Sequence, residues 1–170
     1  MKYLIPLFFY LTSCQSLPVS SGLSEDVPLV YPQEIYRQEI SVWIKKDDQK
    51  MSFSGALKKN PKSFSLFAFT SLGLRIFTLK DDNNGRIEFV SHVAALDDKK
   101  DFILKLYPVI KKIFTLRLND PNYIKRKFDY KLENPIGQVE VEIDSTGSNI
   151  LVIKPNYFEF KMKNLDDKSD

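Results

Sequence analysis

The sequence has little of the chemistry on which metal and thiol sites depend. Its 170 residues include one cysteine, Cys14, and one histidine, His92. A lone cysteine excludes a disulfide within the chain, and a zinc site would need a ligand set made almost entirely of carboxylates, which is unusual. We therefore expect neither a bound metal nor another cofactor.

Common enzyme signatures are also missing. There is no Gly-x-Ser-x-Gly elbow, no glycine-rich phosphate loop and no His-Glu-x-x-His pair. Some paired acidic residues fall at a predicted turn, a predicted helix start and the tail, where aspartate serves turn and capping geometry. The pairs at these three places are Asp81-Asp82, Asp97-Asp98 and Asp166-Asp167, and they are not the full set of adjacent acidic residues. A hydrolase with paired carboxylates is the alternative, but we expect a protein that is not an enzyme.

The sequence also lacks a cluster of charges of one sign. The formal net charge is +3 at pH 7, and lysines and carboxylates are scattered through the chain. Nucleic-acid binding, which needs a concentrated positive surface, is therefore not indicated. A hydrophobic content of 43% and an aromatic content of 13% instead indicate a folded globular protein, and the length suits a single domain.

The N-terminus has the layout of a bacterial signal peptide. Lys2 precedes an apolar run over residues 3–11, which is followed by two small residues and Cys14. The run is too short for a transmembrane helix, which needs about twenty apolar residues. Residues 1–13 are therefore expected to be a signal peptide that is removed.

The sequence Leu11-Thr12-Ser13-Cys14 resembles a lipobox, where bacterial prolipoproteins are lipidated on the cysteine and cleaved just before it. The thiol is the nucleophile that accepts a diacylglyceryl group, and two or three acyl chains of the palmitate type anchor a protein far more firmly than one. Cys14 is thus the predicted lipidation site, and a secreted protein with an unmodified cysteine is the alternative. By resemblance, Gln15 in place of the aspartate that retains lipoproteins in the inner membrane favours an outer-membrane anchor facing the periplasm.

Three further regions follow. Residues 14–30 are rich in Ser, Pro and Gly without a hydrophobic period, which is typical of a flexible tether. A folded domain is predicted over residues 31–165, and residues 166–170 form a polar tail.

Short strands are predicted through the first half of this domain. Residues 40–44 and 51–57 alternate between apolar and polar side chains, the period of a half-buried strand. Residues 64–70 and 74–79 are nearly apolar on both faces, which predicts central strands covered on each side. Asn83-Asn84-Gly85 then predicts a hairpin turn.

The second half combines one helix with more strands. Five apolar residues share a helical face and predict an amphipathic helix over about residues 98–114; they are Phe102, Leu106, Val109, Ile110 and Ile113. Pro108 predicts a break, with a second short helix beginning near it. Residues 128–162 alternate between strands and turns, which predicts an antiparallel meander. The expected fold is mainly β (α+β): a strongly curved antiparallel sheet with the helix packed on its concave side.

Part of this pattern resembles a known family. The matching stretches are Ser54-Gly55-Ala56-Leu57, the strand from Phe64 to Phe69, and Thr70-Ser71-Leu72-Gly73-Leu74-Arg75-Ile76-Phe77-Thr78-Leu79. They are similar to the LolA/LolB-type superfamily, specifically to LolB-like bacterial lipoproteins often encoded beside aryl polyene biosynthesis genes. The resemblance covers residues 35–115. It implies a half-open β-barrel whose helices plug an apolar cavity that accepts acyl chains.

Such a cavity would be lined by one face of the strands and by the helix. Its walls need large apolar side chains because an acyl chain offers nothing to hydrogen-bond. The candidates are Met51, Phe53, Leu66, Phe69, Leu74, Ile76, Phe89, Phe102 and Leu106. An ordinary packed core built from the same residues is the alternative.

Two single residues are assigned structural positions. His92 lies near the end of a predicted strand and is expected at the surface, with contact to a ligand headgroup as the alternative. Trp43 faces away from Val42 and is expected to pack against a neighbouring strand, with a place at a membrane interface or pocket rim as the alternative.

Together these features predict an outer-membrane lipoprotein of the periplasm that binds or transfers a hydrophobic acylated molecule without catalysis. The molecule would be a lipid, a lipoprotein or a polyene-like lipid. The membrane and that ligand are the expected partners, together with other envelope proteins, and nucleic acid is not one. The alternative is a structural or interaction lipoprotein that docks on an envelope protein and has no lipid cavity.

Overall fold

The computed structural model describes residues 27–132 and 136–165. The predicted signal peptide, the predicted lipidation site Cys14, most of the predicted tether and the predicted tail lie outside the described residues. Within the described part, nine antiparallel strands form one sheet in the order β5-β4-β3-β2-β1-β9-β8-β7-β6. The mainly β fold is therefore confirmed.

The strands and helices follow one another in a simple order. The strands are β1 (Ile35–Ile44), β2 (Gln49–Asn60), β3 (Ser63–Phe69), β4 (Arg75–Asp81), β5 (Ile87–Ser91), β6 (Lys127–Lys131), β7 (Gln138–Ile143), β8 (Asn149–Lys154) and β9 (Phe158–Asn164). The helices are α1 (Lys100–Phe114) and α2 (Pro121–Lys125), with 3-10 turns η1 (Lys45–Asp47) and η2 (Ala94–Lys99). The hairpin after β4 and the C-terminal meander lie where the sequence predicted them.

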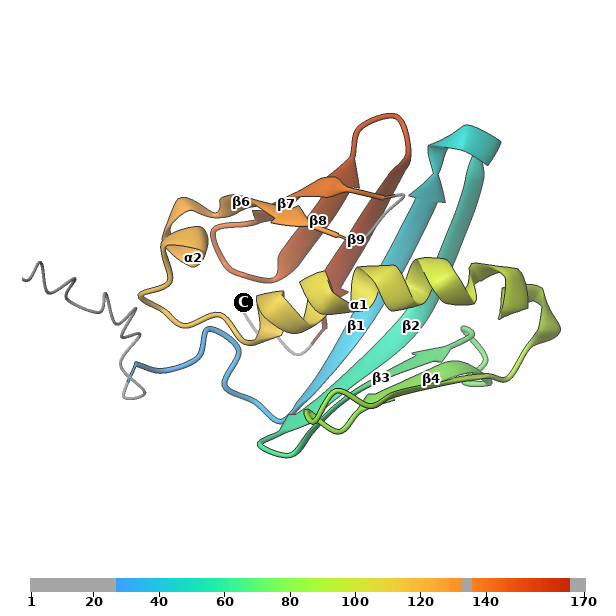
Figure 1. The fold of residues 1–170 in the computed structure, drawn as a ribbon, viewed down its shortest axis with the longest axis horizontal. Helices are drawn as coiled ribbons and strands as arrows, with labels where there is room; N and C mark the ends of the chain where they lie inside the picture. The colour runs from blue at the N-terminus through green and yellow to red at the C-terminus, as the bar shows by residue number, and fades with distance from the viewer. Residues whose placement is uncertain (1–26, 133–135, 166–170) are drawn as a thin grey trace, which may run out of the picture.

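Two meanders are joined into one sheet by the pairing of β1 with β9. The first meander runs from β1 to β5 and the second from β6 to β9, and α1 lies in the connection between them. Figure 1 shows the sheet bent around α1, with β3 and β4 on one side of the helix and the second meander on the other. The edge strands β5 and β6 do not pair with each other, so the sheet is not closed.

Residues 64–70 and 74–79 form interior strands rather than edge strands, as predicted, but the expectation that both of their faces are covered is wrong. They form β3 and β4, which lie toward the β5 edge, whereas β1 occupies the centre of the sheet. In β3, buried residues alternate with half-buried ones, so only the face toward α1, here called the inner face, is well covered. Apolar side chains on the other face misled the prediction, because an apolar composition does not require burial.

The predicted helix break at Pro108 is also wrong, because α1 runs without interruption through it. A proline inside a helix costs about 3 kcal/mol, since it removes a hydrogen bond and crowds the preceding turn. Tyr107, Val109 and Ile110 beside it are buried in the core, and burial of each large apolar side chain contributes about 1.5–3 kcal/mol. Their combined contribution outweighs the cost, and Pro108 itself is exposed.

The interior is filled at the C-terminal end of α1. There the ring of Phe114 lies 4.8 Å from that of Tyr31 and 5.4 Å from that of Tyr36, measured between ring centroids. The ammonium group of Lys59 on β2 donates hydrogen bonds to the carbonyls of Phe114, at 2.9 Å, and Tyr31. Burial lowers the pKa of Lys59 to about 8. This end of the interior is therefore closed by aromatic rings and a half-buried lysine.

The folded part begins earlier than the predicted boundary at residue 31. The backbone N–H of Val30 donates to the carbonyl of Leu116 at 2.9 Å, and the N–H of Leu118 donates to the carbonyl of Pro28 at 3.0 Å. Residues 27–30, assigned to the tether by composition, therefore pair with the segment after α1. Composition missed this because the partner lies far along the chain.

A buried polar cluster attaches α1 to β4. Asp81 on β4 is 4% exposed and accepts hydrogen bonds from the Tyr107 hydroxyl and from the Lys111 ammonium, the latter at 2.6 Å. The backbone N–H of Asn83 donates to its other oxygen at 2.7 Å. Burial by itself would raise the pKa of Asp81, but the hydrogen bonds from Lys111, Tyr107 and Asn83 outweigh burial and lower it.

Candidate functional site

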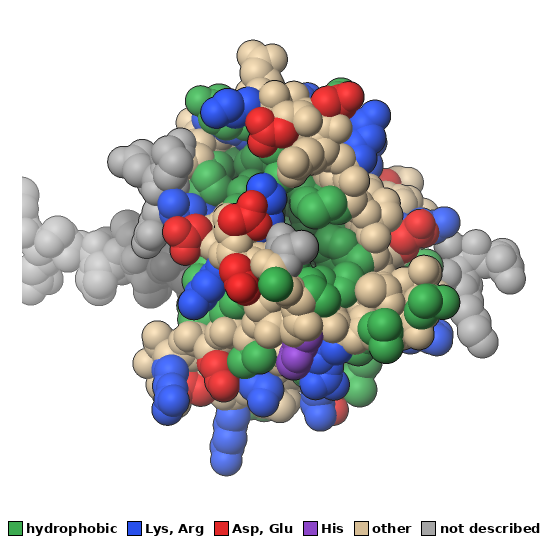
Figure 2. All heavy atoms as spheres, turned by 90° about the vertical axis from the view of Figure 1, so that its right-hand side faces the viewer, with side chains coloured by type: hydrophobic (Ala, Val, Ile, Leu, Met, Phe, Trp, Pro, Cys, Tyr) green, Lys and Arg blue, Asp and Glu red, His purple; other side chains and the backbone are tan. Residues whose placement is uncertain are grey.

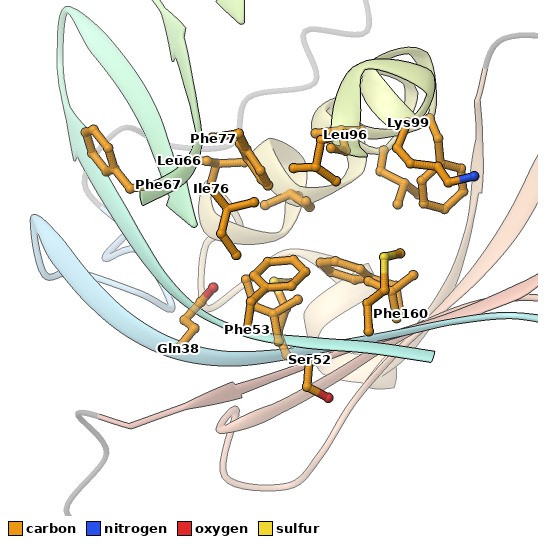
Figure 3. Close-up of a pocket in the computed structure, with 18 of the residues that line it drawn as sticks. Gln38, Ser52, Phe53, Leu66, Phe67, Ile76, Phe77, Leu96, Lys99 and Phe160 are labelled. Carbon is orange, nitrogen blue, oxygen red and sulfur yellow. The ribbon is translucent and has the colours of Figure 1, made fainter. Parts of the chain in front are cut away.

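A cavity of about 410 Å³ lies between the N-terminal half of α1 and the inner face of the sheet (Figure 3). Its walls come from β1, β2, β3, β4 and β9, and the segment around η2 covers one side. This volume falls within the range of about 300–1,000 Å³ that is typical of ligand sites in proteins. The interior is thus filled beneath the C-terminal end of α1 and hollow beneath its N-terminal half.

The walls of the cavity are almost entirely apolar. The apolar residues that border it are Ile40, Val42, Met51, Phe53, Ala56, Leu66, Phe67, Ile76, Phe77, Val93, Leu96, Phe102, Ile103, Leu106, Ile110, Phe160 and Met162. Four polar or charged residues also border the cavity: Gln38, Ser52, Thr70 and Lys99. In Figure 3 the hydroxyl of Ser52 points away from the hollow. Such a surface suits a hydrocarbon chain.

The open end of the cavity lies at the N-terminal end of α1. Figure 2 views the molecule from this side and shows hydrophobic side chains in a hollow with charged side chains around it. Lys99, which ends η2, has its ammonium 3.0 Å from the carboxylate of Asp98. Beside the opening, the turn between β3 and β4 presents Leu72 and Leu74, which are 86% and 65% exposed.

Gly55 on β2 leaves room for the side chain of Ile40, which forms part of the cavity wall. Gly55 lies on the inner face between β1 and β3, and a Cβ atom there would stand 2.5 Å from Cδ1 of Ile40. A side chain at position 55 would therefore displace the end of the Ile40 side chain from its present place across β2. This glycine belongs to the stretch on which the family resemblance rests.

The structure brings together six of the nine predicted lining residues. Met51, Phe53, Leu66, Ile76, Phe102 and Leu106 border the cavity. The cavity therefore joins residues of β2, β3 and β4 to residues of α1.

The other three predicted lining residues lie elsewhere. Phe69 alternates out of phase with the buried residues Leu66 and Ala68, and the β3–β4 register shifts beside it. Leu74 belongs to the exposed turn before β4. Phe89 stacks on Phe77, with ring centroids 5.5 Å apart, and does not reach the cavity. Phe69 is three residues from Leu66, so regular alternation along β3 places it on the other face, and Phe89 belongs to the edge strand β5.

Sequence reasoning missed the walls contributed by β1 and β9. Val42 on β1 pairs with Met51 of β2 on one side and with Phe160 of β9 on the other. Alternation along residues 40–44 was a usable signal for Ile40 and Val42. No local signal exists for Phe160 and Met162, because the pairing of β1 with β9 joins distant parts of the chain.

His92 and Trp43 lie on the surface away from the cavity walls. His92 is exposed just after β5, and its Nε2 lies 3.3 Å from the Thr78 hydroxyl. The indole N–H of Trp43 donates to Asp48 at 2.9 Å, and the Lys50 ammonium of β2 lies 4.9 Å from its ring centroid. Both residues therefore occupy the positions expected for them.

The described residues hold neither a membrane-spanning helix nor a metal-binding cluster. Over 27–132 and 136–165, no helix has the length and apolar character needed to cross a membrane. The same part of the chain holds no group of three or more His, Cys, Asp or Glu side chains that could bind a metal ion.

Comparison with known proteins does not assign the chain to a family. No protein-family model matches it, and no curated protein matches it with significant similarity. The resemblance to LolB-like lipoproteins stays a prediction from the residues quoted above.

Proposed function

We propose that the protein binds the hydrocarbon chain of an acylated molecule in the cavity beneath α1. The proposed role is non-catalytic: the protein shelters the chain from water and releases it to a membrane or to another carrier. In this proposal the bent sheet acts as a half-open barrel of the LolB type, and the acylated molecule is a lipid, a lipoprotein or a polyene-like lipid.

The observation that carries this proposal is a hollow, apolar and open interior in an otherwise well-packed domain. Protein interiors are normally packed as densely as organic crystals, and an apolar void lowers stability in proportion to its volume. Each methylene buried from water contributes about 0.8 kcal/mol. A hydrocarbon chain that enters this cavity would therefore be removed from water, and by filling the void it would stabilise the protein.

The alternative function, docking on an envelope protein, has less support. A protein that only docks on another protein is expected to have no lipid cavity, whereas the cavity here is bordered by five strands and α1. The exposed Leu72 and Leu74 lie beside its opening, where they suit contact with a membrane or a donor of the chain as well as contact with a protein.

Membrane anchoring through Cys14 is part of the proposal. Replacing Cys14 by serine is expected to abolish lipidation, because the thiol is the nucleophile that accepts the diacylglyceryl group. In a diderm host, the parent protein should fractionate with the outer membrane and the serine variant should not. A variant with Ser16→Ala is the matched control and should behave like the parent. Outer-membrane recovery of the serine variant equal to that of the parent would contradict the anchor.

The proposed binding function is tested by native mass spectrometry of the Cys14→Ser variant, which lacks the lipid anchor and can be purified without detergent. We expect a second species whose mass exceeds that of the protein by one lipid molecule and which disappears after extraction with organic solvent. The mass difference would identify the class of ligand. Protein without any bound mass that also fails to bind a fluorescent fatty acid would overturn the proposal and favour docking.

A further inference from the structure

One polar side chain is buried inside the apolar cavity without a hydrogen-bond partner. Gln38 on β1 is 1% exposed, borders the cavity, and its Nε2 has no partner among the described residues. Figure 3 shows Gln38 reaching toward the hollow from the sheet, at the end away from Lys99. The amide thus lies at the inner end of the cavity, while Lys99 is near the opening.

Neighbouring residues do not explain this arrangement. The cross-strand neighbours of Gln38 are Gly55 on β2 and Asn164 on β9, and Gly55 has no side chain to offer. A buried amide donor without a partner costs about 1–3 kcal/mol, and buried polar groups in folded proteins are nearly always paired. An apolar residue at position 38 would fit a plain hydrocarbon site better.

Resting on the proposed function, we propose that the Nε2 of Gln38 donates a hydrogen bond to a carbonyl oxygen carried by the chain that fills the cavity. The ligand class is then an acyl compound, an ester, amide or carboxylic acid, whose carbonyl group is held at the inner end. A hydrogen bond inside an apolar cavity discriminates well, because a ligand that lacks the acceptor leaves the donor unpaired.

The position of Gln38 also indicates how such a ligand is oriented. The one cation among the cavity-bordering residues, Lys99, is near the opening and is paired with Asp98 at 3.0 Å. A fatty acid held by its carboxylate at the opening would depend on Lys99 and place its methyl end near Gln38. A chain bound through Gln38 enters with its carbonyl group first, so the two orientations depend on different residues.

The test compares two uncharged probes of similar size, methyl dodecanoate and tridecane, by displacement of a fluorescent chain from the purified protein. We expect the parent protein to bind the ester about tenfold more tightly than the alkane, the effect of one hydrogen bond of about 1.4 kcal/mol. Gln38→Met, which keeps the length of the side chain but removes the amide, should bind both probes equally. Gln138→Met makes the same change at an exposed position on β7 that does not border the cavity, so it is the matched control and should keep the preference for the ester.

The outcomes separate this inference from the proposed function. Equal binding of ester and alkane by the parent protein, or a preference that survives in Gln38→Met, would overturn the role of Gln38 and leave chain binding intact. Loss of the preference in Lys99→Gln instead would place the carbonyl at the opening and overturn the inference as well. Failure of the parent protein to bind either probe would overturn both proposals. Thermal melting controls for folding, and Gln38→Met should melt at or above the temperature of the parent.

Discussion

Replacing Asp81 by alanine is expected to lower the free energy of unfolding by about 1–3 kcal/mol, the cost of leaving a buried hydrogen-bond donor without its acceptor. The substitution leaves the hydroxyl of Tyr107, which is 2% exposed, without its acceptor. It also removes the ion pair with Lys111 and the hydrogen bond from the backbone of Asn83. Chemical denaturation followed by circular dichroism measures the change.

Two further variants separate the contribution of charge from that of hydrogen bonding. Asp81→Asn keeps an acceptor for Tyr107 but loses the charge that pairs with Lys111, so its effect should be smaller than that of alanine. Glu142→Gln weakens an exposed ion pair with Lys127, which lies at 3.1 Å, and should change stability little because exposed pairs are screened by water. An Asp81→Ala variant as stable as Glu142→Gln would contradict the structural role of the cluster.

The contribution of Asp81 should also depend on pH. Hydrogen bonds from Lys111, Tyr107 and Asn83 overcome the opposing effect of burial and hold the pKa of Asp81 below its usual value in the folded state. A lowered folded pKa means that the stabilisation is fully present above the unfolded pKa of about 3.9. It is lost as the pH falls through the folded pKa. The difference in stability between the parent and Asp81→Ala should therefore shrink below about pH 4 and be constant from pH 5 to 7.

Replacing Val42 by phenylalanine is expected to reduce chain binding more than tenfold without destabilising the fold. Val42 lies on the inner face between Met51 and Phe160, and all three border the cavity. The added ring has space to occupy and takes the volume that the ligand would fill. Displacement of a fluorescent fatty acid measures binding, and thermal melting measures stability.

The same substitution in a filled part of the core is the matched control. Val141 on β7 is fully buried and does not border the cavity. Inserting a ring into packed core costs about 1–3 kcal/mol, so Val141→Phe should melt at a lower temperature and still bind the chain once folded. If Val42→Phe proved as destabilising as Val141→Phe, the space beneath α1 would be packed rather than hollow.

Much of the secondary structure followed from local sequence. Alternation along residues 40–44 and 51–57 predicted parts of β1 and β2, and Asn83-Asn84-Gly85 predicted the hairpin after β4, because both signals depend on neighbouring residues. The helical face of residues 98–114 predicted α1 for the same reason. Pro108 shows the limit of such reasoning. A proline inside a helix does carry a free-energy cost, but the burial of neighbouring side chains that outweighs this cost depends on the tertiary fold.

The candidate site was predictable only in part. Six of the nine proposed wall residues border the cavity because strand and helix periodicity showed which side chains share a face. Phe69 was misplaced because its odd spacing from Leu66 puts it on the opposite face of β3, and Leu74 because it lies in an exposed turn. Phe160 was missed because it comes from a strand at the far end of the chain.

Sequence by itself determined the periodicity of the strands, the amphipathic character of α1 and the apolar composition of the interior, all of which depend on short stretches of chain. Only the tertiary structure decided that β1 is central and pairs with β9, and that the interior is filled at one end of α1 and hollow at the other. It also decided that Gln38, an ordinary polar position in a strand, is buried in an apolar cavity without a partner. The physical reason is that strand pairing and the volume enclosed by a bent sheet arise from contacts between distant residues, whereas periodicity records only which side chains share a face.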